Sequence, residues 1–277
     1  RKNYVFRPQV ILKKAAPGQR AMLYPEEIEK LTKLSEKKYL DYSKEEQDLI
    51  LNLFVLNPHK IPHPFPRFQM AFTAKQGFTL SDSDRYELKM AGYFAFLKRA
   101  QEQKVLYVEF TDAFAARIEK DVEKYRQLSE LLERQTGVKV RWNIAMVRDE
   151  NPIDNHQLVK SIANFISSSQ DDQFPFLGID MVAYEESKDA LEAGYLPYLE
   201  MLNREKSGRP FLWRTIHAWE HGKVENVRDS ILLGTNRIGH GVKAAEDLVT
   251  LEWLRRLKLP IEINITSNYY LGAVTLG

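Results

Sequence analysis

The segment FLWRTIHAWEHGKVENVRDSILLGTNRIGHG, residues 211–241, contains the pattern that decides the fold. An apolar, β-branched run leads to His217, a helical stretch follows over 225–234, and a short apolar run then ends at His240. A strand, a helix and a strand in this order predict a parallel unit, because the crossover helix returns the chain to the same edge of the sheet. We therefore expect His217, Glu220 and His240 at the carboxyl ends of neighbouring strands.

The same alternation continues on both sides of this segment. Strict alternation of strands and helices predicts a parallel sheet covered by helices. We expect an α/β protein with a (β/α)8 barrel of TIM type, whose eighth strand is not visible in this sequence. A doubly wound open sheet is the rival, but no GxGxxG or GxxxxGK[ST] motif occurs in the chain. Strands are predicted near residues 104, 138, 176, 211, 236 and 261, with PQVILK at 8–13 as a further candidate.

The start of the chain is basic and is followed by helical stretches. Residues 1–24 contain six Lys or Arg residues and no acid. We interpret them as a flexible, solvated lead segment, with a basic arm for an anionic partner as the alternative. Residues 25–277 are expected to form a single barrel domain that is incomplete at its C-terminus. Within it, the proline-rich stretch NPHKIPHPFPRF at 57–68 predicts a loop.

Composition limits the classes of function. The 277 residues are 44% hydrophobic and carry a net charge of +2, a balance that implies no nucleic-acid partner. No cysteine is present, so a metal ion would have to be bound by histidine and carboxylate side chains. The sequence has no apolar run near the roughly 20 residues that span a bilayer, and no signal-peptide pattern. We expect a cytoplasmic globular protein with a small-molecule partner and no membrane partner; the composition sets no oligomeric state.

His217, Glu220 and His240 are the residues on which catalysis could depend. A neutral imidazole is a good zinc ligand, and a catalytic zinc lowers the pKa of its bound water to about 7. A carboxylate near the ligand can take that proton and return it to a leaving group, while a second histidine can hold the hydroxide. The alternative is that both histidines are hydrogen-bonded polar residues at strand ends, and residue types alone leave the two interpretations about equal.

Several blocks of the sequence resemble the adenosine deaminase family. TIHAWE, LLGTNRIGHG and PIEINITSNYYLGAV follow one another as the family's HAGE, R[IL]GHG and serine-rich blocks do. LYVEF and LGIDMVAYE are similar to its YVE and GIDLAGDE blocks, so the resemblance extends from about residue 65 to 274. It implies a barrel with one Zn²⁺ that removes ammonia by hydrolysis from adenosine or a related purine nucleoside. On this mapping His217 would bind the metal, Glu220 would protonate the purine ring, and His240 would orient the attacking hydroxide.

The same resemblance assigns residues to the substrate. Phe68 and Phe72 have the spacing of the family's FxxxF and would line an apolar lid over the base, with ordinary core packing as the alternative. Ala183 stands at the glycine of the GIDLAGDE block that contacts substrate, where its methyl group would crowd the purine. HAGE is HAWE here, with Trp219 in place of glycine. These two departures favour an altered substrate or lost activity.

The metal-binding motifs of the family are also altered. Its first strand carries HxH, but the best-aligned stretch, VILKKAAPG, has Lys13 and Ala15 at the histidine positions. The Asp pair of the closing strand does not occur in the sequence. A single histidine cannot hold a catalytic zinc. Two interpretations remain: an inactive scaffold that binds a nucleoside or a protein partner, or a sequence with segments missing, which the unpaired strand edges favour.

The other candidate ligands have simpler interpretations. His59 and His63 lie among prolines, which keep them off a helix face, so they are expected to be loop residues rather than replacement ligands. His156 and His221 are expected at the surface. Asp180, in a strand pattern, is expected to be a hydrogen-bonded structural acid rather than a catalyst.

Overall fold

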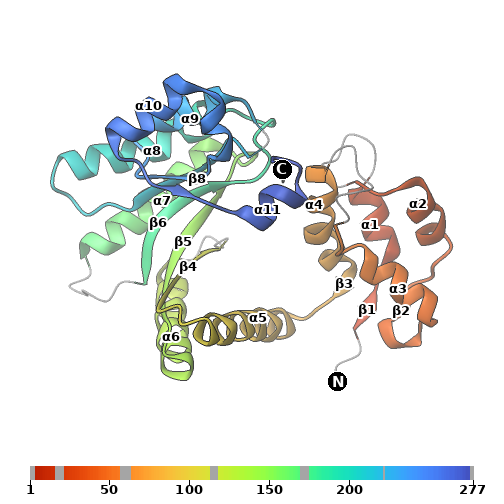
Figure 1. Cartoon of the computed structure of the whole chain (residues 1–277). Helices are drawn as coiled ribbons and strands as arrows, with labels where there is room; N and C mark the ends of the chain where they lie inside the picture. Colours follow the sequence, from red (N-terminus) through yellow and green to blue (C-terminus); the bar gives the residue numbers. More distant parts are fainter. Residues whose placement is uncertain are drawn as a thin grey trace. The chain divides into compact units, whose positions relative to one another are not determined.

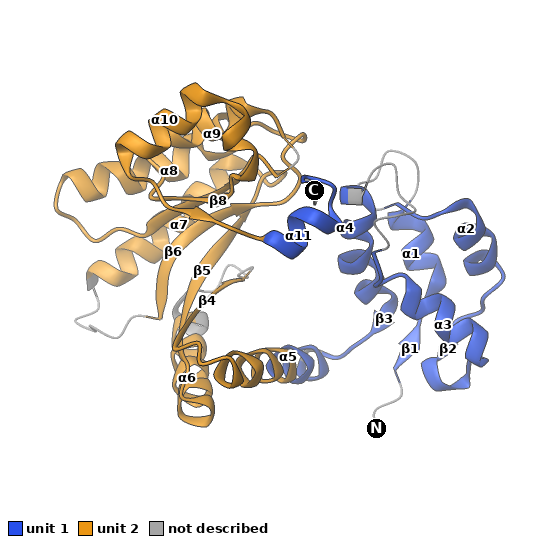
Figure 2. Ribbon diagram, viewed as in Figure 1, with its two compact units in different colours: residues 1–90, 265–277 blue, residues 91–264 orange. Residues whose placement is uncertain are grey.

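The structure, a computed structural model, divides into two compact units. The first contains residues 1–90 and 265–277, and the second contains residues 91–264 (Figure 2). The expectation of one domain from residue 25 onward did not anticipate this division. No helix of the described chain has the length and apolar character that crossing a bilayer requires. The residues described are 4–15, 22–56, 64–112, 118–168, 175–220 and 222–274.

The second unit is built on a parallel sheet that curls like half of a barrel (Figure 1). Six described strands pair in chain order, and this α/β half-barrel confirms the predicted fold class. The strands are Tyr107–Asp112 (β4), Lys139–Val147 (β5), Phe176–Val182 (β6), Trp213–Ala218 (β7), Arg237–His240 (β8) and Ile261–Glu262 (β9). The helices are Asp82–Glu102 (α5), which begins in the first unit, and Ile118–Thr136 (α6), Pro152–Ser168 (α7), Ala190–Lys206 (α8), Val224–Leu232 (α9) and Leu248–Leu257 (α10).

Alternating burial along β5 shows how this sheet forms its core. Val140, Trp142, Ile144 and Met146 are almost completely buried on one face of the strand. The Trp142 indole packs against the rings of Tyr93, Phe110 and Tyr125, with centroids 4.9–5.3 Å apart, and donates to Ser129 at 2.7 Å. A period of two places these side chains together, as the apolar pattern of the sequence predicts.

An ion-pair bridge crosses the concave side of the sheet. Arg237, the first residue of β8, contacts Glu109 of β4 at 2.6 Å and Glu262 of β9 at 2.7 Å. Because β4 and β8 are four strands apart, their backbones would be about 19 Å apart in a flat sheet, given about 4.8 Å between strands. The Arg237–Glu109 contact is therefore formed across the curl and stabilises it.

The first unit combines a small antiparallel sheet with short helices. Its strands are Val5–Phe6 (β1), Lys37–Lys38 (β2) and Phe78–Thr79 (β3), in the order β2-β1-β3. Its core contains fully buried side chains, among them Phe6, Ile11, Leu31, Ile50 and Met70. The helices are Pro8–Lys14 (α1), Pro25–Thr32 (α2), Lys44–Asn52 (α3), Pro64–Ala74 (α4) and Ile265–Tyr270 (α11), with 3-10 turns at Tyr39–Asp41 and Lys75–Gly77.

Two predictions for the start of the chain were wrong. PQVILK forms the helix α1 and not a strand, since Pro8 occupies the first turn, where a backbone N–H is not needed. Phe6 and Ile11 are completely buried, so the described part of the lead segment is folded and not flexible, although its basic side chains Lys13 and Lys14 are exposed. Apolar burial of these two side chains outweighs the basic composition around them.

Two further element boundaries differ from prediction. Helix α4 begins at Pro64, inside the stretch predicted as a loop, because Pro64 and Pro66 both fall in its first turn. Strand β9 is limited to Ile261–Glu262, and the following ITSN residues enter helix α11. Residues 57–63 of the predicted loop lie outside the described residues.

Candidate active site

His217 lies near the carboxyl end of β7, where a carboxylate fixes its ring. Its Nδ1 is 2.9 Å from an oxygen of Asp180 on β6, and Asp180 is 2% exposed. The hydroxyl of Thr111 on β4 donates to the other Asp180 oxygen at 2.7 Å. Asp180 is thus a buried, hydrogen-bonded acid, as predicted. It directs the imidazole so that Nδ1 is engaged and Nε2 is turned away from it.

The same carboxylate changes the protonation of His217. Burial lowers the pKa of the imidazole, but the charge of Asp180 and its hydrogen bond outweigh this effect and raise the pKa to about 9. The carboxylate of Glu220 acts in the same direction. At neutral pH and without a metal ion, His217 is therefore an imidazolium whose Nδ1 donates to Asp180.

Glu220 and His240 meet beside this ring. An oxygen of Glu220, in the loop after β7, lies 3.3 Å from Nε2 of His240, the last residue of β8. Both side chains are less than 10% exposed, and the His217 and His240 rings are 5.1 Å apart between centroids. Gly239 lies opposite His217 on β8 and leaves room for the His217 ring, since a Cβ there would meet His217 Nδ1 at 2.9 Å. The structure therefore brings together the three residues that the sequence singled out at the strand ends.

The backbone at this edge is left-handed at three residues that carry a Cβ. Ala183 has a φ of 83°, Trp219 of 59° and His240 of 64°. This conformation favours glycine because Cβ crowds the following carbonyl oxygen. Ala183 and Trp219 stand where the family pattern has glycine, and their left-handed backbone gives a reason why the family prefers glycine there. The placement of Ala183 in the substrate pocket remains a prediction.

The ligand-type residues do not complete a metal site. No group of three or more His, Asp or Glu side chains suited to one metal ion occurs in the described part of the chain. His156 is 3.9 Å from Glu200 with its side chain 27% exposed. His59, His63 and His221 lie outside the described residues.

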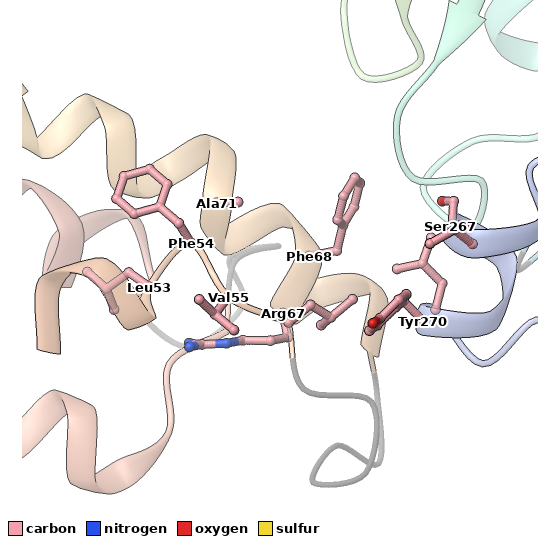
Figure 3. A pocket seen from close by; sticks show the side chains of 11 residues that line it. Leu53, Phe54, Val55, Arg67, Phe68, Ala71, Ser267 and Tyr270 are labelled. Atoms are coloured by element: carbon pink, nitrogen blue, oxygen red, sulfur yellow. The ribbon is translucent and has the colours of Figure 1, made fainter. Parts of the chain in front are cut away.

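Phe68 and Phe72 belong to α4 in the first unit. Phe68 lines an apolar pocket of about 380 Å³ together with residues before α4 and on α11, including Val55 and Tyr270 (Figure 3). Phe72 packs edge to face on Phe68 at 5.3 Å but is 47% exposed and does not line that pocket. The structure thus places Phe68 in the wall of a cavity and Phe72 outside that wall, largely exposed. A role for either residue in substrate binding stays a prediction.

Two residues of the site were missed in the sequence. Thr111 follows the YVEF block, and its only signal was its place at a strand end. Glu185 ends the VAYE stretch of the block similar to GIDLAGDE, so the resemblance contained it without giving it a role. Its carboxylate accepts hydrogen bonds from the backbone N–H groups of Trp219 and Glu220.

Comparison with known proteins identifies the family of this chain and solved structures that share its fold. The sequence profile of the adenosine deaminase family matches residues 29–276. An adenosine deaminase from Clostridium perfringens (strain 13 / Type A) is 26% identical over 180 residues, which are 63% of this chain and 51% of that protein. The solved adenine deaminase from Arthrobacter aurescens has 18% identity and a TM-score of 0.56 over 97% of this chain and 71% of its own. An amidohydrolase from Burkhoderia ambifaria, solved with bound Zn, has 14% identity and a TM-score of 0.60 over 84% of this chain and 60% of its own.

The chain belongs to the adenosine deaminase family. The family resemblance of the sequence blocks is thereby confirmed. The chain spans about half the length of the curated relative from Clostridium perfringens. The two solved structures are less than 20% identical to it, so they demonstrate the shared fold.

Proposed function

We propose that the protein is an aminohydrolase that replaces the amino group of adenosine, or of a related purine nucleoside, with oxygen from water. Membership of the family supports this class of reaction. The observation that carries the proposal is the convergence of Glu220 and His240, 3.3 Å apart and buried, beside the His217 ring.

Each of these side chains suits one part of the reaction. Water adds to the ring carbon that carries the amino group, the carbon–nitrogen bond breaks, and ammonia leaves. Of the two protons of the water, one must reach the purine ring nitrogen and the other the departing amine, which leaves as ammonia. Glu220, as a carboxylate held against His240, is the group to carry these protons in turn, and the His240 imidazole orients the water. Their burial excludes bulk water, which strengthens both interactions.

Zn²⁺ is the cofactor that the resemblance implies, and a protein of the same fold was solved with it. Among the described residues, His217 is a suitable ligand, but Asp180 beside it is engaged by two hydrogen bonds and no third group joins them. A catalytic zinc uses three protein ligands, so these residues alone do not fit the ion. The proposed roles of Glu220 and His240 therefore include no metal step.

A second function is a scaffold that binds a purine nucleoside or a protein partner without turnover. The incomplete set of metal ligands among the described residues favours this alternative. The two functions differ in one measurable property, which is the release of ammonia.

Replacing the proposed proton carrier tests the enzyme directly. In the intact protein, Glu220→Gln keeps the side-chain shape but cannot carry a proton. We expect kcat for ammonia release from adenosine to fall by about 10²–10⁴-fold, the usual contribution of general acid–base catalysis, with KM nearly unchanged. Glu225→Gln, at an exposed position on α9, is the matched control and should keep full activity.

Three outcomes would decide against parts of this proposal. A wild-type protein that binds adenosine but releases no ammonia is the scaffold. Equal turnover by wild type and Glu220→Gln would remove Glu220 from the chemistry. Metal analysis of the purified, intact protein tests the cofactor, and zinc below about a tenth of an equivalent would argue against a tightly held catalytic ion.

A further inference from the structure

A single carboxylate holds the loop that carries Glu220. Glu185 lies in the turn after β6 and is 3% exposed. One of its oxygens accepts the N–H of Glu220 at 2.7 Å, and the other accepts the N–H of Trp219 at 2.7 Å. Hydrogen bonds to a buried carboxylate are short and strong, because the acceptor is charged. The N–H of the candidate proton carrier and the N–H of the residue before it thus share one anchor.

The backbone of this loop has a shape that suits an anion. Trp219 has a φ of 59°, and a left-handed residue turns successive N–H groups towards a common point, which forms a concavity for a negative group. A residue with a Cβ adopts this conformation only where its surroundings hold it. The carboxylate of Glu185 provides such a hold.

The anchor itself is fixed from several sides. Asn226 on α9 donates to Glu185 at 3.1 Å and accepts the N–H of Ala190, the first residue of α8. A Cβ at Gly222 would meet Glu185 at 2.5 Å and Asn226 at 2.6 Å, so any larger residue there requires the ends of these two side chains to shift. Buried Arg148 supplies compensating charge: burial lowers its pKa, and the negative charge of Glu185 is the largest influence in the other direction.

The geometry points to Glu185 as a positioning residue that sets the Glu220 carboxyl group against His240. Its two oxygens engage the N–H groups of the two peptides on either side of Trp219, and the second of these N–H groups belongs to Glu220, so they fix where the Glu220 side chain begins. Its effect on the reaction rests on the proposed function, whereas its effect on the loop does not. Misplacement of a catalytic group by about 1 Å can lower a rate on the order of 100-fold.

Substitution of Glu185 by Gln in the intact protein tests the inference. Glutamine keeps the volume but presents an amide donor to one of the two backbone N–H groups. We expect kcat for ammonia release to fall on the order of 100-fold, with KM within about threefold of wild type. In a crystal structure of the variant we expect Trp219 to leave its left-handed conformation and Glu220 to move about 1 Å or more from His240.

Two further variants make the test specific. Glu205→Gln removes another paired carboxylate of the same unit, the partially exposed partner of Arg214 at 2.5 Å, and should leave kcat and the loop unchanged. Gly222→Ala adds a methyl group that crowds the Glu185 carboxylate without removing its charge. Like Glu185→Gln, it should lower kcat and leave KM unchanged. This variant tests the inference if Glu185→Gln does not fold.

The possible results separate this inference from the proposed function. If the wild type releases no ammonia, the proposed function fails, and the crystal structures still decide whether Glu185 places Glu220. The inference is overturned if the variant keeps the Trp219 conformation and the 3.3 Å contact. It is also overturned if kcat in an active protein falls no further than in Glu205→Gln.

Discussion

The two edges of the parallel sheet in the second unit are built differently. At the carboxyl edge, Ala183, Trp219 and His240 have left-handed backbone, and buried ionisable side chains meet. At the amino edge, Arg214, the second residue of β7, and Arg237, the first residue of β8, form ion pairs with carboxylates. Left-handed residues also precede β4 and β9, at Lys104 and Lys258, so the two edges differ in their contacts and not in backbone conformation alone. Buried ionisable groups converge at the carboxyl edge, and arginines pair with carboxylates at the amino edge.

The hydrogen bonds of the two edges show how this difference is maintained. The Arg214 side chain is 2% exposed, donates to the Gly234 carbonyl at 2.6 Å and pairs with Glu205 on α8. These contacts join a strand to the helix and turn that pack on it. At the carboxyl edge, Glu185 instead binds the backbone of a loop that would otherwise relax. One arrangement stabilises the fold, and the other fixes a local geometry.

The largest expected effect on stability is at the amino edge. Arg214→Met leaves Glu205 unpaired and the Gly234 carbonyl unsatisfied, so we expect the free energy of unfolding to fall by about 3 kcal/mol in urea titrations. The kcat of the folded variant should match wild type. A smaller loss is expected for Glu205→Gln, since this carboxylate is 33% exposed. A tenfold loss of kcat in Arg214→Met would show that the two edges are not separate in function.

Relief of strain at the carboxyl edge should have the opposite sign. Ala183→Gly removes the Cβ that disfavours a φ of 83°, and we expect the free energy of unfolding to rise by about 1 kcal/mol. Ala95→Gly is the matched control, because the same change in the exposed, right-handed middle of α5 should lower stability by about 1 kcal/mol. If both substitutions destabilise equally in thermal melts, the left-handed backbone at Ala183 carries no strain.

The smallest effect is expected at an exposed helix start beyond β8. Asp247 caps α10, and its hydrogen bonds from Thr250, together with Arg228, hold its pKa at about 2, below the usual 3.8. A lowered pKa in the folded state stabilises the fold above pH 4, and this contribution is lost as the pH falls towards 2. Asp247→Asn should therefore weaken the acid dependence of urea unfolding over this range. An unchanged pH profile would show that the contact is not maintained in solution.

Much of the fold could be predicted from the alternation of strands and helices. The strand ends at His217 and His240 were placed correctly because parallel strands all finish at one edge. PQVILK was assigned wrongly, since its short apolar run at 10–12 suits a strand or a short buried helix equally. Only the packing of Phe6 and Ile11 decides between them, and that packing depends on residues far along the chain.

The residues of the candidate site could be predicted, but the residues that hold them in place could not. Trp219 and Ala183 were recognised as departures from glycine, but their left-handed backbone is a property of the folded loops. Glu185 had no local signature, because a carboxylate that accepts backbone N–H groups 34 and 35 residues away looks like any other acid in the sequence. Contacts of this kind are set by tertiary structure alone.

The Arg237 bridge lets one side chain change the curl of the sheet. Because the Arg237–Glu109 contact joins β4 to β8, the length of these two side chains limits how closely the two strands approach. Exchanging Glu109 for the shorter Asp would draw the two strands together or break the contact. The sheet would then curl more or less tightly, although no residue of the candidate site at its carboxyl edge had been replaced.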